Sequence, residues 1–222
     1  MRMPQTKASK GSQKWIQQLV NEHRDIFAEE LAAHLPRGLA ENIEWLSPLK
    51  NDDYAEYRDV SFLNRLGIRN PKDVLRNFWP NRGPQWDALG KAGDNGPYFL
   101  VEAKANIPEI VSCCEAKSER SRKLIRSSLR RTQGHFGYKP LLDWMTGFYQ
   151  YANRLAHLYY LRVLNKLDAR LVFVYFVNDD THIATSLDQW EAALTLQKRL
   201  MGIGKHGLKD AILELFVDTR KL

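Results

Sequence analysis

The chain has 222 residues, 44% of them hydrophobic and 27% charged, with a formal net charge of +7 at pH 7. This balance is typical of a globular protein long enough to form a core, and it excludes a disordered or collagen-like chain. The longest apolar run, residues 171–177, is far shorter than the roughly 20 residues of a membrane-spanning helix, and no apolar signal segment follows Met1. We therefore expect a cytoplasmic protein without a membrane partner.

The chain begins with a basic, polar segment. Residues 1–11 show no apolar periodicity, so we predict a mobile basic arm, followed by a single domain over residues 12–222. Residues 1–14 contain four basic residues and no acidic residue, which gives this end of the chain a charge of +4. The charge makes the arm a candidate for contacts with phosphate groups.

Helical spacing follows the arm. Apolar residues recur at three- and four-residue intervals between Trp15 and Leu31. Gly67 supplies a stop for a second helix, and Pro71 is well placed to begin a third. The helices that we predict here are, in order, residues 12–35, 51–66 and 71–78.

A β-hairpin is predicted in the middle of the chain. Turn-forming residues at 79–84 precede a short strand at 85–89, and a glycine-rich loop occupies residues 90–97. The second strand, residues 98–104, is apolar almost throughout. Beyond the hairpin we predict helices and strands at 112–131 (helix), 141–166 (helix), 170–177 (strand), 187–200 (helix) and 211–217 (strand). This order predicts an α/β fold with a central mixed β-sheet and helices on both sides.

Two charged residues interrupt the apolar strand at its carboxyl end. Residues two apart on a strand point to the same face, so Glu102 and Lys104 are neighbours, whereas Val101 and Ala103 face the other way. Burying a charge costs several kcal/mol unless the charge is paired or bound to a metal. A salt bridge at a frayed strand end is one explanation of this pair.

A third charged residue favours a different explanation. Asp87 lies on the partner strand of the hairpin, fifteen residues before Glu102, and can approach it across the hairpin. Two carboxylates beside a lysine suit a divalent cation such as Mg²⁺, which prefers oxygen ligands and keeps several waters. The lysine could orient or help to deprotonate an attacking water, or offset negative charge in a transition state.

Asp87, a spacer of fourteen residues, and then Glu102-Ala103-Lys104 resemble the motif of the PD-(D/E)xK, or restriction-endonuclease-like, nuclease superfamily. The resemblance covers mainly residues 79–104, and Trp86 stands where the motif has proline. It implies a restriction-endonuclease-like core, a mixed four-stranded sheet flanked by helices in the order αβββαβ. It also implies that Asp87, Glu102 and the Ala103 carbonyl bind Mg²⁺, with Mn²⁺ as a substitute, and that Lys104 is catalytic.

The same resemblance implies further site residues. An upstream glutamate often completes the metal site in this family. Glu56 is our candidate, with Glu41 and Glu44 as alternatives. Some of these nucleases also place a glutamine on a later helix near the catalytic lysine, and Gln150 fits that place. It begins a polar stripe at helical spacing that comprises Gln150, Asn153, Arg154 and His157.

A basic stripe follows the hairpin. Residues 115–139 have a net charge of +6, which leaves −3 for the chain outside this segment and residues 1–14. Cations recur there every three or four residues and would follow a nucleic-acid backbone along one helix face. These candidate nucleic-acid-binding residues are Lys117, Arg120, Lys123, Arg126 and Arg130, together with Arg82 in the loop before the hairpin. A solvated helix face is the alternative.

The sequence therefore predicts a metal-dependent nuclease that hydrolyses phosphodiester bonds, with DNA as the expected substrate. One alternative is a non-catalytic nucleic-acid-binding protein that retains the nuclease-like fold. Another is an enzyme that acts on a different phosphorylated substrate. Restriction-like nucleases often act as dimers, so a homodimer stays open, although the sequence identifies no interface.

Overall fold

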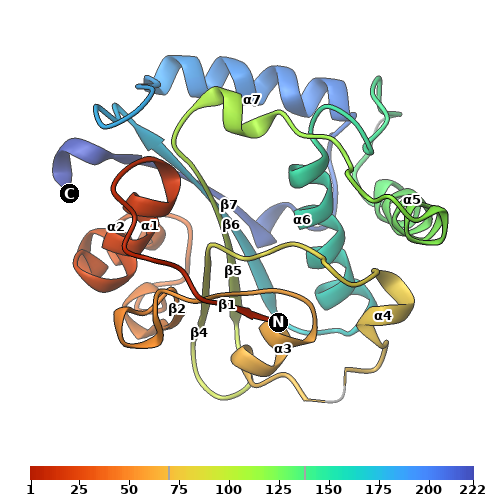
Figure 1. Cartoon of the computed structure of the whole chain (residues 1–222), viewed down its shortest axis with the longest axis horizontal. Coiled ribbons are helices and arrows are strands. Elements are labelled where there is room, and N and C mark those ends of the chain that lie inside the picture. Colours follow the sequence, from red (N-terminus) through yellow and green to blue (C-terminus); the bar gives the residue numbers. More distant parts are fainter. Residues whose placement is uncertain (70, 138) are drawn as a thin grey trace.

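The computed structural model describes residues 1–69, 71–137 and 139–222. A mixed sheet of 5 strands, in the order β2-β4-β5-β6-β7, forms its centre, and a 2-stranded sheet joins β1 to β3 (Figure 1). The strands are β1 (Arg2–Met3), β2 (Glu44–Ser47), β3 (Glu56–Tyr57), β4 (Ala88–Lys91), β5 (Tyr98–Lys104), β6 (Ala169–Val177) and β7 (Ile212–Asp218). The helices are α1 (Gly11–Asn21), α2 (Arg24–Ala32), α3 (Val60–Leu66), α4 (Leu75–Phe78), α5 (Glu119–Gln133), α6 (Tyr149–Tyr159) and α7 (Leu187–Met201).

The topology of the sheet confirms the predicted α/β class. β4 and β5 form the antiparallel hairpin, while β6 pairs in parallel with both β5 and β7. β2 adds an antiparallel edge strand beside β4. Figure 1 shows α1 and α2 on one side of the sheet and α5 and α6 on the other. No helix in the described part of the chain has the length and apolar character needed to cross a bilayer.

β5 is apolar almost throughout because both of its faces are covered. Leu100 packs into a core that includes α3, α6 and α7, whereas Val101 and Ala103 pack into a second core formed with α1 and α2. A strand buried on both faces loses the polar alternation of a half-exposed strand. Glu102 and Lys104 stand out for this reason, since they project from the face that α6 covers.

Gly90 allows β2 to lie close to β4. A Cβ atom at this position would come within 2.9 Å of side-chain carbons of both Ile43 and Trp45. Real Cβ atoms do not approach so closely, so the edge strand packs on β4 only because residue 90 has no side chain. The sequence analysis placed Gly90 in the hairpin loop, whereas the strand continues to Lys91.

Five predicted helices differ from the structure. The helices expected over 71–78 and 112–131 begin only at Leu75 and Glu119. The helix expected over residues 12–35 is two helices, α1 and α2, separated at Glu22–His23. The helix expected over 51–66 is interrupted: a 3-10 turn over Lys50–Asp52 ends at Asp53, and residues 53–59 are not helical, because Asp53, Tyr54 and Asp59 have φ values of 51°, 46° and 54°. The helix expected over 141–166 begins only at Tyr149, and it continues beyond α6 as a π-helical turn over Tyr160–Leu164.

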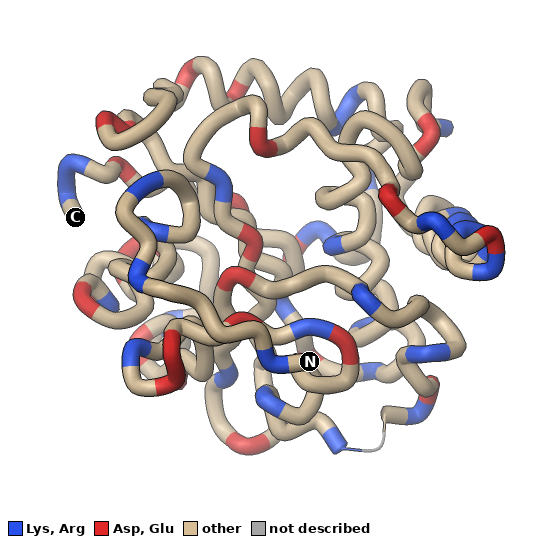
Figure 2. The backbone as a smooth tube through the Cα atoms, in the orientation of Figure 1, with Lys and Arg blue, Asp and Glu red and all other residues tan. Residues whose placement is uncertain are grey.

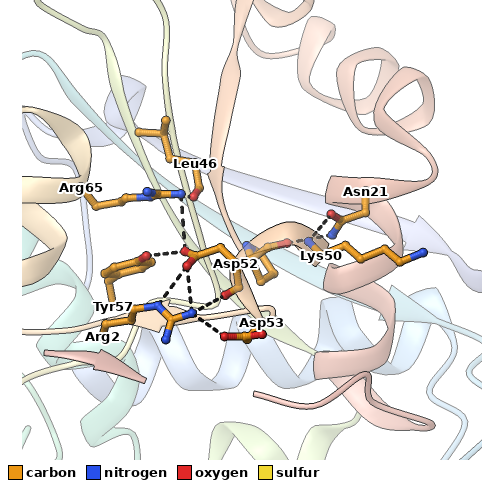
Figure 3. Close-up of polar contacts among 9 residues, drawn as sticks. Arg2, Asn21, Leu46, Lys50, Asp52, Asp53, Tyr57 and Arg65 are labelled. Carbon is orange, nitrogen blue, oxygen red and sulfur yellow. Dashed lines mark hydrogen bonds and ion pairs between the residues drawn. The ribbon is translucent and has the colours of Figure 1, made fainter. Parts of the chain in front are cut away.

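The N-terminal segment, which we expected to be a mobile arm over residues 1–11, lies against the body in the structure. β1 pairs with β3, and the Met1 amine donates a hydrogen bond to the Arg58 carbonyl at 2.6 Å. Figure 3 shows the Arg2 guanidinium between Asp52 and Asp53, with Arg2 Nη2 2.9 Å and 2.8 Å from their carboxylates. The charge of Arg2 is thus balanced by these two carboxylates rather than left free for phosphate.

Candidate active site

The β4–β5 hairpin brings Asp87 and Glu102 opposite each other. Asp87 directly precedes β4, and its backbone N–H donates to the Val101 carbonyl at 3.2 Å. Its Oδ2 accepts a hydrogen bond from the Ala103 N–H at 2.7 Å. Lys104 Nζ lies 2.7 Å from Glu102 Oε1, so the strand periodicity predicted the shared face of these two side chains correctly.

Helix α6 supplies two further side chains to this face. Lys104 Nζ donates to Gln150 Oε1 at 2.9 Å, and Arg154 Nε donates to Glu102 Oε2 at 2.6 Å. Four residues of helix rise about 6 Å, and two residues of strand span about 6.6 Å. The pair Gln150 and Arg154 on the helix therefore matches the pair Lys104 and Glu102 on the strand.

Glu56 reaches the cluster from β3. Its carboxylate accepts hydrogen bonds from the side chain of Gln85 and, at 3.4 Å, from Gln13 Nε2 on α1. Burial raises the pKa of Glu56, and the nearby Glu102 carboxylate raises it further. The alternatives Glu41 and Glu44 are exposed, and Glu44 pairs with Lys91 at 3.6 Å on the edge of the sheet. Of the three glutamates, Glu56 is the one beside Glu102.

The carboxylates of the cluster differ in their electrostatics. Burial alone would raise the pKa of Glu102, but the cations Arg154 and Lys104 outweigh it and lower that pKa. Asp87 forms no ion pair with a described residue, and its pKa is raised well above the usual value, first by burial and then by Glu102 and Glu56. Two cations thus face three carboxylates, and Asp87 bears the uncompensated charge.

The donor set fits a hard divalent cation. Carboxylate oxygens of Asp87 and Glu102 adjoin across the hairpin, and mutual repulsion of this kind is what a bound cation relieves. Within residues 1–69, 71–137 and 139–222, no three Asp, Glu, His or Cys side chains form a closed metal cage. Mg²⁺ commonly binds through one or two carboxylates and completes its shell with water and substrate oxygens.

Sequence reasoning missed two residues of the cluster. Arg154 was noticed only as part of a polar stripe, yet it is buried, contacts Glu102 and lies 4.9 Å over the ring of Trp86. Gln85 was read only as part of a strand, yet its carbonyl accepts from Arg154 Nη2 at 2.8 Å while its amide contacts Glu56. The helical spacing of Arg154 from Gln150 was the available signal. Gln85 gave none.

The rest of the polar stripe on α6 comprises Asn153, whose Oδ1 accepts from Arg154 Nη1 at 2.8 Å, and His157, which does not reach the cluster. His157 is buried, and its Nδ1 donates to the Asn153 carbonyl at 2.8 Å. Its ring packs against four aromatic rings, which belong to Phe62, Phe78, Trp79 and Trp86. Burial lowers the pKa of His157 to about 3. It is therefore a neutral packing residue.

The basic candidates lie away from the carboxylates, mainly on α5. Figure 2 shows Lys and Arg concentrated along this helix at one side of the molecule. Lys123 pairs with Glu119 at 2.7 Å and Arg126 with Asp143 at 2.8 Å. Three exposed candidates form no ion pair with a described residue: Lys117 and Arg120 at the start of the helix and Arg130 near its end. Arg82 is exposed in the loop before β4.

Comparison of the chain with protein-family models, with curated proteins and with solved structures finds no match.

Proposed function

We propose that this protein is a metal-dependent nuclease with a restriction-endonuclease-like core, and that it hydrolyses phosphodiester bonds in DNA. The observation that carries the proposal is the placement of Asp87, Glu102 and Lys104. They share one face of a buried hairpin, and Gln150 is hydrogen-bonded to the lysine. An apolar core does not require such a cluster, because buried charges cost free energy without giving packing.

The order of elements supports the restriction-endonuclease-like core. That family implies the order αβββαβ around a mixed sheet. The sequence of α2, β2, β4, β5, α6 and β6 follows this order once β3, α3 and α4, which lie between β2 and β4, and α5, which precedes α6, are set aside as insertions. β6 runs parallel to β5, as a crossover through a helix requires. Trp86, which replaces the proline of the motif, is fully buried and supports Arg154.

Each residue of the cluster has a role in this proposal. Asp87 and Glu102 would hold Mg²⁺, with the Ala103 carbonyl as a third ligand and Glu56 beside them. A metal ion at this place would make a bound water more acidic and offset charge on the phosphoryl group. Burial alone would lower the pKa of Lys104, but Glu102 and Asp87 outweigh it and raise the pKa, so the side chain stays protonated. Lys104 therefore acts as a cation that orients water and stabilises negative charge, not as a base.

The nucleic acid would be held by the cations on α5. Lys117, Arg120 and Arg130 carry positive charge on an exposed helix face, which fits a phosphate backbone regardless of base sequence. Lys123, Arg126 and Arg82 belong to the same proposed surface. Lys123 and Arg126 would first exchange their carboxylate partners for phosphates.

The test is cleavage of plasmid and linear DNA by the purified protein with Mg²⁺ or Mn²⁺. We expect the wild type to cut, and we expect Asp87→Ala and Lys104→Ala to lose at least about a hundredfold in rate. Asp94→Ala, in the exposed loop of the hairpin, is the control and should cut normally. Equal cleavage by wild type and both site variants would contradict the proposal.

One observation favours a second candidate, a non-catalytic nucleic-acid-binding protein that retains the fold. Arg154 and Lys104 together engage both oxygens of Glu102, which is also the arrangement of a structural ion-pair network. This alternative predicts salt-dependent DNA binding without cleavage. Calorimetric titration with Mn²⁺ separates the two. The nuclease proposal expects uptake that Glu102→Gln abolishes, and the alternative expects no uptake by either protein.

A further inference from the structure

A small cavity lies beside Lys104, between β5, β6, α6 and α7. Its volume is about 10 Å³, and its lining includes Glu102, Lys104, Gln150 and Gln197. The rest of the wall is mainly aromatic, with Phe173 and Tyr175 from β6. A space of this size is about large enough to hold one water molecule.

Gln197 is the unexplained member of this wall. Its side chain, on α7, is only 1% exposed, and neither Oε1 nor Nε2 has a hydrogen-bond partner among the described residues. Leaving a buried amide unpaired costs about 1–3 kcal/mol. An apolar side chain would fill this place at lower cost, so an amide here requires a ligand.

Lys104 offers the complementary group. An ammonium carries three N–H donors. One of them donates to Glu102 Oε1 at 2.7 Å and a second to Gln150 Oε1 at 2.9 Å. The third is left for a group in the cavity. A water molecule there can accept from Lys104 Nζ and from Gln197 Nε2 and donate to Gln197 Oε1, which satisfies all three groups.

We propose that Gln197 is a positioning residue of the candidate active site, whose amide holds a water molecule against the ammonium of Lys104. The water gives Nζ a third partner besides Glu102 and Gln150, so that the lysine keeps one orientation. The inference rests on the proposed nuclease function, because it assigns Gln197 a role in placing the catalytic lysine. Gln197 itself touches neither substrate nor metal.

The test is the substitution Gln197→Met, which keeps the length and volume of the side chain and removes its polar atoms. We expect kcat for DNA cleavage to fall about tenfold, as is usual for residues behind a catalytic group, with KM unchanged. The melting temperature should change little, since methionine fills the same volume and the amide has no protein partner to lose. Thr195→Met, on the exposed side of the same helix, is the matched control and should leave kcat unchanged.

A second measurement is independent of activity. A high-resolution crystal structure of the wild type should show an ordered water within hydrogen-bond distance of Lys104 Nζ and the Gln197 amide. A dry cavity, or normal kcat in a folded Gln197→Met variant of an active protein, would overturn this inference and leave the proposed function intact. Absence of cleavage by the wild type would instead refute the proposed function and the role of Gln197 with it.

Discussion

Asp87, a residue of the candidate site, has an environment that opposes stability. Its carboxylate accepts from the Ala103 N–H, yet burial and the carboxylates of Glu102 and Glu56 raise its pKa well above the usual value. A carboxyl group with a raised pKa in the folded state favours folding while it is protonated. Its contribution is lost as the pH rises through the folded-state pKa. Above the folded-state pKa, the ionised side chain therefore destabilises the fold.

We predict that Asp87→Asn makes the protein more stable and abolishes cleavage. Asparagine keeps an oxygen acceptor for the Ala103 N–H and removes the repelling charge. The gain in unfolding free energy should be larger at pH 8 than at pH 5, because the wild-type carboxyl ionises as the pH rises. Urea denaturation at the two pH values measures it. Asp94→Asn, on the exposed hairpin loop, should change neither quantity, and a loss of stability in Asp87→Asn would contradict this electrostatic account.

His157 makes stability depend on pH in the opposite direction. Its pKa is lowered from 6.5 to about 3 because the ring is buried, so the unfolded chain binds a proton that the folded protein does not. The contribution of the neutral ring is complete above pH 6.5 and is lost progressively as the pH falls toward 3.

We predict that His157→Phe reduces the loss of stability on acidification. Each pH unit below the unfolded pKa is worth about 1.4 kcal/mol, so from pH 6.5 to 5 the wild type should lose about 2 kcal/mol through this residue. Urea denaturation across this range gives the slopes. His34→Phe, at an exposed position, should keep the wild-type slope. Parallel slopes for wild type and His157→Phe would show that the buried ring does not titrate as we infer.

At this scale the sequence predicted part of the cluster. Strand periodicity placed Glu102 beside Lys104, and the predicted hairpin allowed Asp87 to approach Glu102, since both rules concern neighbours in the chain or across one turn. The contacts of Gln85 and Gln197 depend on how distant elements pack. No local pattern reports such contacts.

At the scale of elements, α5 carries the proposed nucleic-acid surface. Its apolar side buries Ile125 and Leu129 against the body, which turns its cations outward. Arg120 and Arg130 are exposed, and neither has an ion-pair partner among the described residues. Because they have no such partner, they can contact a phosphate backbone without first breaking an ion pair.

We predict that the double variant Arg120→Gln and Arg130→Gln binds DNA more weakly and with less dependence on salt. Each phosphate contact that is lost should lower the slope of log affinity against log salt by about one. Fluorescence anisotropy with a labelled duplex over several salt concentrations measures both quantities. Arg220→Gln, an exposed arginine paired with Asp218 near the C-terminus, is the control. An unchanged slope in the double variant would place the DNA elsewhere on the protein.

The boundaries of elements were less predictable than their types. The bounds of β5, β6 and α7 lie close to the predicted ranges. Long apolar runs define the two strands, and a capping residue defines the start of the helix. The predicted helix at 51–66 was wrong over its first half. There the backbone adopts left-handed conformations at Asp53 and Tyr54, and β3 pairs with β1. A strand of two residues whose partner lies at the start of the chain has no periodic signature.

At the scale of the whole molecule, the two basic segments of the sequence lie in different environments. The two basic segments were predicted to act alike, but the first is docked, with Arg2 between Asp52 and Asp53. The second is helix α5, where several cations stay exposed. Docking residues 1–11 on β3 also places Gln13 against Glu56, so the N-terminal segment supports the carboxylate cluster. Net charge alone could not separate these roles.

The central claim is that Asp87, Glu102 and Lys104 hydrolyse phosphodiester bonds with a divalent cation. The most direct test is the initial rate of DNA cleavage as a function of Mg²⁺ concentration, for the wild type and for Lys104→Met. We predict a rate that rises to saturation in the wild type, disappears with EDTA and returns with added Mn²⁺, and a variant that stays at least about a hundredfold slower at saturating metal. Cleavage that persists in EDTA, or that Lys104→Met retains at the wild-type rate, would contradict it.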